Sequence, residues 1–203
     1  MATLKSVCVY CGSGEGSDPA YGEAADALGA ALAGAGIRLV YGGGSLGLMG
    51  RVARACLDHG GQVTGIIPGF LHTREVMLKR VTDLIITEDM HQRKRRMFEE
   101  AEAFVALPGG IGTLEELVEM LTWSQLGRHK KPVLIADIKG FWAPLLALLD
   151  HMRGEGFIRS GYEVNCLTAT RAEDILPMLQ EALAPLECCD VEPSLVEAEV
   201  DKL

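Results

Sequence analysis

The chain has 203 residues, 48% of them hydrophobic, and a formal net charge of −9. This length and apolar content suit one domain with a single core, and the acidic balance argues against a general nucleic-acid binder, whose surface is basic. The expected partner is therefore a small molecule, and the lack of a long apolar run or a signal-peptide pattern predicts a cytoplasmic protein with no membrane partner.

Short apolar runs alternate with helical patterns along the chain. The predicted strands, in order, are Ser6–Tyr10, Ile37–Tyr41, Val63–Ile67, Leu84–Thr87, Phe104–Leu107 and Val133–Ala136. Strands that are apolar throughout and separated by helices indicate a mainly parallel sheet covered on both faces, which is a three-layer α/β/α arrangement.

The helices are indicated by apolar periodicity and by terminal signals. Asp18 followed by Pro19 predicts the start of the first helix, and Gly34 with Gly36 predicts its end. Further helices are predicted at Leu48–His59, Met90–Ala103, Leu114–Gln125, Phe141–Arg153 and Ala172–Ala184. A short strand near Val164–Leu167 is expected to close one edge. We expect one domain over residues 1–186 and a loosely attached acidic tail over residues 187–203.

Three predicted strands end in glycine-rich loops, at Cys11–Gly16, Gly42–Gly47 and Pro108–Glu116. Ligands of parallel α/β sheets bind outside the carboxyl ends of the strands. We therefore expect the three loops to form one site for a phosphate and a sugar.

The second loop partly matches two well-known nucleotide motifs. Gly42, Gly44 and Gly47 fit the dinucleotide fingerprint, but the strand that should end in a ribose-binding acid ends in Ile66–Pro68. Leu48 also stands where a triphosphatase loop requires lysine. The sequence therefore favours neither NAD nor ATP chemistry, and no cofactor is expected.

The third loop reads Pro-Gly-Gly-Ile-Gly-Thr-Leu-Glu-Glu. Gly109, Gly110 and Gly112 remove side chains that would block access to the backbone, and the free N–H groups of a following helix suit a phosphate. Thr113 and Glu116 also have the spacing of a capping box, in which each side chain bonds the other residue's N–H. At this point both interpretations stand.

The helix after this loop carries two apolar stripes. The first contains Leu114, Leu117, Val118 and Leu121; the second contains Met120 and Trp123 and is continued by Thr113 and Glu116. We therefore expect Glu116 to face a partly enclosed space. A carboxylate beside a phosphate site requires a nearby cation.

The preceding helical pattern supplies candidates for that cation. Its core positions, Met90, Met97, Phe98 and Ala101, recur at helical spacing. Arg93 and Lys94 lie between core positions, so at least one should lean over the sheet edge, whereas Arg95 and Arg96 are expected to be solvated.

Cys8 and Cys11 have the spacing of metal ligands, but no second pair and no histidine pair accompanies them. We expect no metal and predict that the six cysteines are reduced thiols.

Three segments, Tyr41–Ser45, Met90–Lys94 and Pro108–Glu116, resemble in order and spacing the Lonely Guy family of cytokinin riboside 5′-monophosphate phosphoribohydrolases, formerly labelled lysine decarboxylases. The likeness runs from about Val7 to Leu167. It implies a homodimer of Rossmann-like fold that hydrolyses the N-glycosidic bond of adenosine 5′-monophosphates, including N6-substituted ones. The implied products are a free adenine-type base, such as a cytokinin, and ribose 5-phosphate.

The resemblance also implies roles for individual residues. Arg93 and Glu116 become the catalytic pair. The implied substrate contacts are Glu75, Arg93, Lys94, Gly110, Ile111, Gly112, Thr113, Leu114, Glu115, Glu116 and Thr122. Glu75 could instead be a surface acid, and Thr122 could equally bond its own helix backbone.

The expected chemistry places Glu116 beside the anomeric carbon, where it stabilises the oxocarbenium-like transition state or attacks the sugar directly. The glycines and Thr113 would hold the 5′-phosphate, while Arg93 would pair with Glu116 or contact the phosphate or base. Two other readings compete: a pyridoxal phosphate decarboxylase, for which Lys94 is the only motif lysine, and a non-catalytic nucleotide or molybdenum-cofactor carrier. A homodimer is also predicted from the apolar Phe141–Leu149 segment and the doubly apolar helix.

Overall fold

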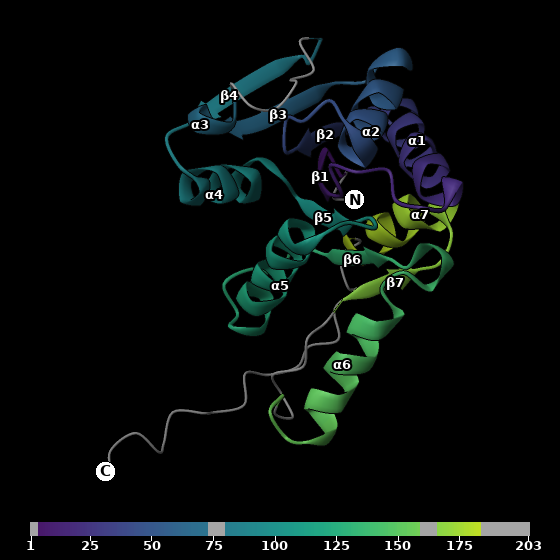
Figure 1. Ribbon diagram of the computed structural model, residues 1–203, viewed down its shortest axis with the longest axis vertical. Coiled ribbons are helices and arrows are strands. Elements are labelled where there is room, and N and C mark those ends of the chain that lie inside the picture. Colours follow the sequence, from purple (N-terminus) through teal and green to yellow (C-terminus); the bar gives the residue numbers. More distant parts are fainter. Residues whose placement is uncertain (1–3, 73–79, 159–165, 184–203) are drawn as a thin grey trace, which may run out of the picture.

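A parallel sheet of seven strands organises the described part of this computed structural model, which comprises residues 4–72, 80–158 and 166–183 (Figure 1). The strands are β1 (Ser6–Tyr10), β2 (Arg38–Tyr41), β3 (Val63–Pro68), β4 (Asp83–Thr87), β5 (Ala103–Ala106), β6 (Val133–Ala136) and β7 (Leu167–Ala169). Their spatial order is β4-β3-β2-β1-β5-β6-β7, and every neighbouring pair is parallel. The predicted α/β class and single-domain Rossmann-like fold are confirmed.

Helices cover both faces of the sheet. They are α1 (Pro19–Gly34), α2 (Gly47–Asp58), α3 (Gly69–His72), α4 (Met90–Glu100), α5 (Ile111–Gln125), α6 (Ala143–Gly154) and α7 (Ala172–Leu183), with a short 3₁₀ turn, η1 (Ile138–Gly140). Helices α1, α2 and α7 share one apolar core with the sheet, and α4, α5 and α6 share the other. No helix in the described ranges is long and apolar enough to cross a membrane.

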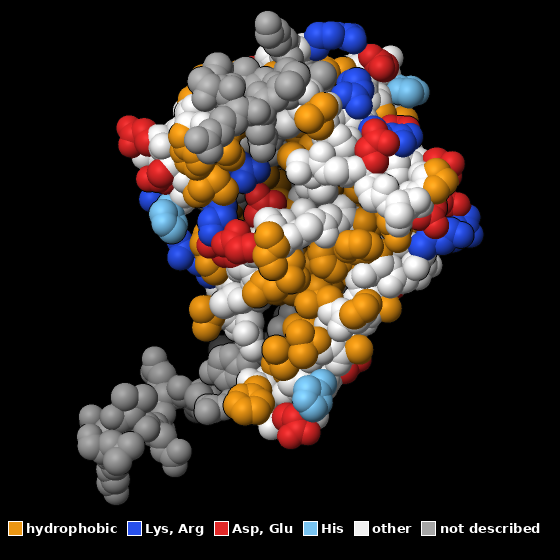
Figure 2. Space-filling model, viewed as in Figure 1, with side chains coloured by type: hydrophobic (Ala, Val, Ile, Leu, Met, Phe, Trp, Pro, Cys, Tyr) orange, Lys and Arg blue, Asp and Glu red, His pale blue; other side chains and the backbone are white. Residues whose placement is uncertain are grey.

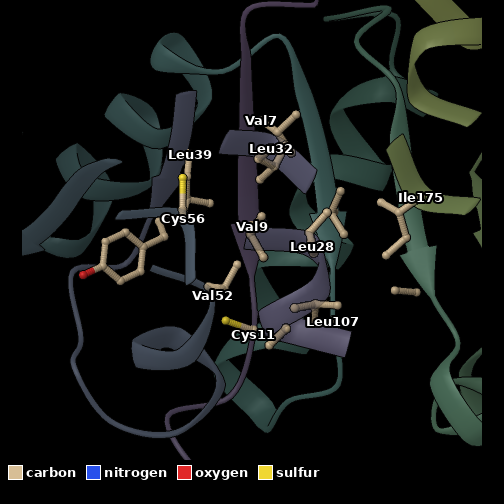
Figure 3. Packing of buried hydrophobic residues seen from close by; sticks show 14 of the residues in the cluster. Val7, Val9, Cys11, Leu28, Leu32, Leu39, Val52, Cys56, Leu107 and Ile175 are labelled. Atoms are coloured by element: carbon tan, nitrogen blue, oxygen red, sulfur yellow. The ribbon is translucent and has the colours of Figure 1, made fainter. Parts of the chain in front are cut away.

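Alternate side chains along each strand point to opposite faces of the sheet and therefore belong to different cores. Val7 and Val9 of β1 point toward α1 and α2, whereas Cys8 and Tyr10 point toward α4 and α5. Figure 3 shows the first core, where Leu28 from α1 packs beside Val9. Because both faces of β1, β3, β5 and β6 are buried, these strands read as nearly continuous apolar runs.

The predicted strands lie close to the observed ones, and the larger differences occur at helix ends. Helix α4 stops at Glu100 because Ala101 adopts an extended backbone that leads into β5, so the predicted end at Ala103 is wrong. The expected strand near Val164–Leu167 is replaced by β7, which begins at Leu167; residues 159–165 lie outside the description. The predicted acidic tail also lies outside it.

Helices α1 and α2 pack so closely that a glycine is required between them. A Cβ atom on Gly29 would overlap the carbonyl oxygen of Val52 and lie 2.9 Å from the Cβ of Ala55. We expect Gly29→Ala to lower the free energy of unfolding by about 1–3 kcal/mol, because backbone atoms must move apart. Urea denaturation checks this, with Gly34→Ala as the matched control, since nothing lies within 4 Å of a Cβ at that helix position. Equal losses in the two variants would contradict the packing argument.

Candidate active site

The site lies where the strand order reverses, between β1 and β5. This topological switch point is the usual ligand site of open parallel sheets, because the chain leaves the two strands toward helices on opposite faces of the sheet. Here the loops after β1 and β5 touch: Gly12 N donates to Pro108 O at 3.1 Å, and a Cβ on Gly12 would lie 3.3 Å from Gly109 Cα. The first and third glycine loops are thus brought together.

The second glycine loop also reaches this point, but its helix does not offer all its donors to a ligand. Leu48 N and Met49 N, in the first turn of α2, donate to Gly14 O and Gly12 O, each at 3.2 Å. The carbonyls of the first loop therefore satisfy donors that a phosphate would otherwise use. Part of the second loop's donor capacity is therefore used within the protein and not by a ligand.

The third loop keeps its donors free. Helix α5 begins at Ile111, with Gly110 as an extended N-cap that makes no side-chain cap bond, and its first backbone bond runs from Leu114 N to Gly110 O. The N–H groups of Ile111, Gly112 and Thr113 therefore have no intrahelical acceptor. A Cβ on Gly110 or Gly112 would meet open space within 4 Å.

The capping-box interpretation is wrong, as is the predicted helix start at Leu114. Thr113 is the third residue of α5 and not its N-cap, so its hydroxyl does not have the cap geometry. Its buried side chain lies against Gly109, where a Cβ would overlap Thr113 Oγ1. Gly109 thus provides space for Thr113, while Gly110 and Gly112 face the open side.

Arg93 and Glu116 form a buried ion pair between α4 and α5. Arg93 Nη1 lies 3.0 Å from Glu116 Oε1, and the two side chains are 11% and 10% exposed. Arg93 Nε donates to Ile66 O, at the end of β3, at 3.1 Å. Of the two predicted cations, Arg93 therefore leans over the sheet edge.

Burial dominates the electrostatics of this pair. It raises the pKa of Glu116 above its ordinary value, and the nearby Glu115 carboxylate adds to the increase, while Arg93 opposes it. Burial, with the Glu116 charge adding to it, also raises the pKa of Cys8 and Tyr10 of β1 and of Cys11 just after that strand. These three groups stay neutral, so the charges that act on Glu116 come from α4 and α5: Arg93, Lys94 and Glu115.

Lys94 is engaged by α5. Its Nζ donates to Glu115 Oε1 at 2.6 Å and to Glu119 Oε1 at 3.1 Å, and its side chain is largely buried. The implied substrate contacts Lys94 and Glu115 therefore bind each other and join α4 to α5. Glu119 was not among the predicted site residues, although its position four residues after Glu115 indicated that the two share a helix face.

The remaining predicted residues are spread around the site. Thr122 Oγ1 donates to Val118 O at 2.7 Å, which is the backbone alternative for this residue. Ile111 projects into solvent at the loop mouth, whereas Leu114 packs against the second core. Glu75 lies outside the described residues.

Two further predictions concern the surroundings of the site. Arg95 and Arg96 lie on the solvated surface of α4, where both pair with Glu99, as predicted. Among the residues that the structure describes, no group of three or more His, Cys, Asp or Glu side chains is placed to hold a metal ion.

A cavity of about 320 Å³ adjoins the touching loops on the α1 side. It is lined by residues 12–16 and 108–110 of the two loops and by Tyr21, Leu48 and Phe141. Its volume lies within the range of small-molecule sites. The cavity meets the start of α5 at Gly110, whereas Arg93 and Glu116 are not part of its lining.

Comparison with known proteins agrees with this architecture. A family model described as "Possible lysine decarboxylase" matches residues 49–179. Cytokinin riboside 5′-monophosphate phosphoribohydrolase LOG of Oryza sativa subsp. japonica is 45% identical over 184 residues, covering 91% of this chain and 76% of that protein. A cytokinin riboside 5′-monophosphate phosphoribohydrolase of Arabidopsis thaliana is 44% identical over 201 residues, covering 98% and 91%.

Solved structures share the fold at lower identity. The molybdenum cofactor binding protein of Rippkaea orientalis has a TM-score of 0.66 and 22% identity, covering 89% of this chain and 98% of that one. The Moco carrier protein of Chlamydomonas reinhardtii has a TM-score of 0.67 and 21% identity, covering 90% and 99%. At this identity they support the architecture alone. The family model and the phosphoribohydrolases that are 44–45% identical together show that the chain belongs to the Lonely Guy (LOG) family.

Proposed function

We propose that this protein is an N-glycosyl hydrolase that cleaves adenosine-type 5′-monophosphates, including cytokinin riboside 5′-monophosphates, into the free base and ribose 5-phosphate. The observation that carries the proposal is the buried Arg93–Glu116 pair beside the open start of α5. The names of relatives that are 44–45% identical over most of the chain support the same reaction.

The start of α5 is the proposed phosphate site. The free N–H groups of Ile111, Gly112 and Thr113 point out of the positive end of the helix, which favours an anion. The open space beyond Gly110 and Gly112 lets a phosphate reach the backbone. Binding the phosphate there fixes the sugar near Glu116, which lies one turn further along α5.

Glu116 is the proposed catalytic carboxylate. When the bond between C1′ and the base breaks, its electron pair leaves with the base and positive charge develops on the sugar. An ionised Glu116 stabilises that charge or attacks C1′, and water supplies the oxygen of the ribose 5-phosphate product and the proton of the base. Arg93 opposes the effect of burial on the pKa of Glu116. The carboxylate therefore stays ionised at a lower pH than it would without Arg93.

A homodimer is the proposed assembly. Hydrophobic side chains gather over α5 and α6 in Figure 2, and those exposed on or next to these helices include Ile111, Val118, Leu126, Leu148, Met152 and Phe157. Val118 belongs to one of the two predicted apolar stripes of α5, and its exposure leaves part of that stripe for a partner. Light scattering checks the assembly, and a monomer at micromolar concentration would contradict it.

The cytoplasm is the proposed location, with a small-molecule substrate and no nucleic-acid partner. The free thiols of Cys8, Cys11, Cys56 and Cys166 fit a reducing compartment. The net charge of −9 fits a protein that does not bind polyanions.

Product analysis over a panel of nucleoside 5′-monophosphates tests the reaction. AMP and N6-isopentenyl-AMP should release free base and ribose 5-phosphate in equal amounts, and the matching nucleosides, which lack the phosphate, should react poorly. Calorimetric binding of the nucleotides without release of base would instead support a carrier and overturn the hydrolase proposal.

Gly112 offers a separate test of the phosphate site. Gly112→Ala should raise the free energy of unfolding by about 0.4–1 kcal/mol, because alanine restricts the unfolded chain and meets no atom within 4 Å in the helix. The same methyl group would stand where the phosphate approaches, so KM for AMP should rise. Thermal unfolding and steady-state kinetics measure the two effects. A variant that is more stable with an unchanged KM would remove Gly112 from the proposed phosphate site.

A further inference from the structure

Gly42 follows β2 directly and lies against the catalytic pair. A Cβ on Gly42 would overlap the Nη2 atom of Arg93 and lie 3.2 Å from Met49 Sδ. Within residues 42–47, positive φ angles occur at Gly43 and Gly47 and not at Gly42. The backbone conformation therefore does not require glycine at position 42, but the neighbouring guanidinium does.

Three separate elements fix the guanidinium of Arg93. Nε donates to the carbonyl of Ile66 at the end of β3, Nη1 pairs with Glu116 on α5, and Nη2 lies over Gly42 after β2. The guanidinium is planar and is held through Nε and Nη1. It cannot move away from Gly42 and keep its contacts with both Ile66 O and Glu116. Space at Gly42 is therefore a condition for the ion pair.

We propose that Gly42 is a positioning residue, whose missing side chain provides the space in which Arg93 reaches both Ile66 O and Glu116. This gives the glycine run after β2 a role other than holding phosphate, consistent with the first-turn donors of α2 being taken by Gly12 and Gly14. The proposal rests on the proposed function, because it explains how the catalytic pair is held.

A methyl group at position 42 should change the charge balance at Glu116 in a defined direction. The charged groups that act on Glu116 are Arg93 and Lys94 on α4 and Glu115 on α5, while Cys8 and Tyr10 of β1 and Cys11 just after it are neutral. Of these, the methyl group displaces Arg93. Loss of the nearest cation should raise the pKa of Glu116 further, so the acidic limb of the activity profile should move to higher pH.

The test compares Gly42→Ala with Gly34→Ala, a control at the end of α1 with no atom within 4 Å of the new Cβ. Because the overlapped atom is the end of a flexible side chain, the fold should tolerate the change. We expect kcat on AMP to fall about 10²-fold, as for a misplaced catalytic group. KM should change little because the start of α5 is untouched, and the control should match the wild type. Wild-type kcat in Gly42→Ala would overturn the proposal.

A measurement that does not need turnover separates this inference from the proposed function. In protein labelled with carbon-13 glutamate, the Glu116 carboxyl signal, identified by its absence in Glu116→Gln, should titrate at a higher pH in Gly42→Ala than in the wild type. An unchanged titration with a lowered unfolding temperature would show general loop damage and overturn the inference. A shifted titration in a protein that releases no base from any nucleotide would instead overturn the hydrolase proposal alone.

A second background keeps the test valid if Gly42→Ala folds poorly. In Arg93→Ala protein the overlapping guanidinium is gone and Met49 Sδ, at 3.2 Å, is the remaining neighbour, so adding Gly42→Ala should cost far less stability than it does in the wild type. Equal costs in the two backgrounds would mean that the methyl group disturbs something other than Arg93, contrary to the proposal.

Discussion

Replacing Glu116 with glutamine should abolish nearly all release of base and leave the fold intact. Glutamine has the same shape and its amide oxygen can still accept from Arg93 Nη1, which lies 3.0 Å from the carboxylate. The neutral amide cannot stabilise positive charge on the sugar or attack it, so kcat should fall by about 10²–10³-fold or more. Measuring adenine released from AMP, together with circular dichroism, checks both halves of the expectation.

Glu99→Gln is the matched control, because Glu99 is a surface carboxylate of α4 that pairs with Arg95 and Arg96. Its activity should equal that of the wild type. The wild-type pH profile adds a second check: burial raises the pKa of Glu116 above 4.5, so activity should be lost as pH falls, beginning above the range of an ordinary glutamate. Undiminished turnover in Glu116→Gln would eliminate the proposed catalytic role.

Arg93→Ala should lose both activity and stability at neutral pH. The substitution leaves the Glu116 carboxylate buried without its cation and leaves Ile66 O without its donor. Breaking a buried pair by removing one partner costs about 3–5 kcal/mol in free energy of unfolding. Arg95→Ala is the control, because that exposed pair with Glu99 should contribute no more than about 1 kcal/mol.

The loss in Arg93→Ala should depend on pH in a known direction. Removing Arg93 takes away an interaction that lowers the pKa of Glu116, so the folded-state pKa, already raised, rises further. A carboxyl group whose pKa is raised in the folded state makes folding less favourable once the unfolded chain ionises. The stability lost by the variant is therefore small below about pH 4.5 and grows as pH rises through the folded-state pKa of Glu116. Urea unfolding at several pH values measures this. A deficit that is constant with pH would show that the buried carboxylate is not its cause.

The central strands were predicted well because they are buried on both sides. Residues such as Val7 and Cys8 point to opposite faces, yet both are fully buried, so the chain shows a continuous apolar run that few other structures produce. The same reasoning predicted that Arg93 or Lys94 would lean over the sheet edge, because both lie between core positions of α4, and the structure shows that Arg93 does so.

The details of the site depended on information that periodicity does not contain. Thr113 has the spacing of an N-cap, but the helix starts at Ile111 because Gly110 takes the extended cap position. Lys94 pairs with two carboxylates on another helix, Glu115 and Glu119, and only the packing of α4 on α5 decides this. Apolar patterns locate elements, whereas contacts between elements decide which polar groups remain free for a substrate.

The order of the strands has a consequence for how the chain folds. Strands β1 to β4 are complete by Thr87 and pair locally, whereas β1 pairs with β5 through Val7 and Ala103, across about half the chain. Until β5 arrives, β1 presents an apolar edge with unpaired backbone groups, which can associate with other chains. Closing so long a loop slows folding. Because Arg93 and Glu116 flank β5 in sequence, the N-terminal half sheet can form during synthesis well before any catalytic centre exists.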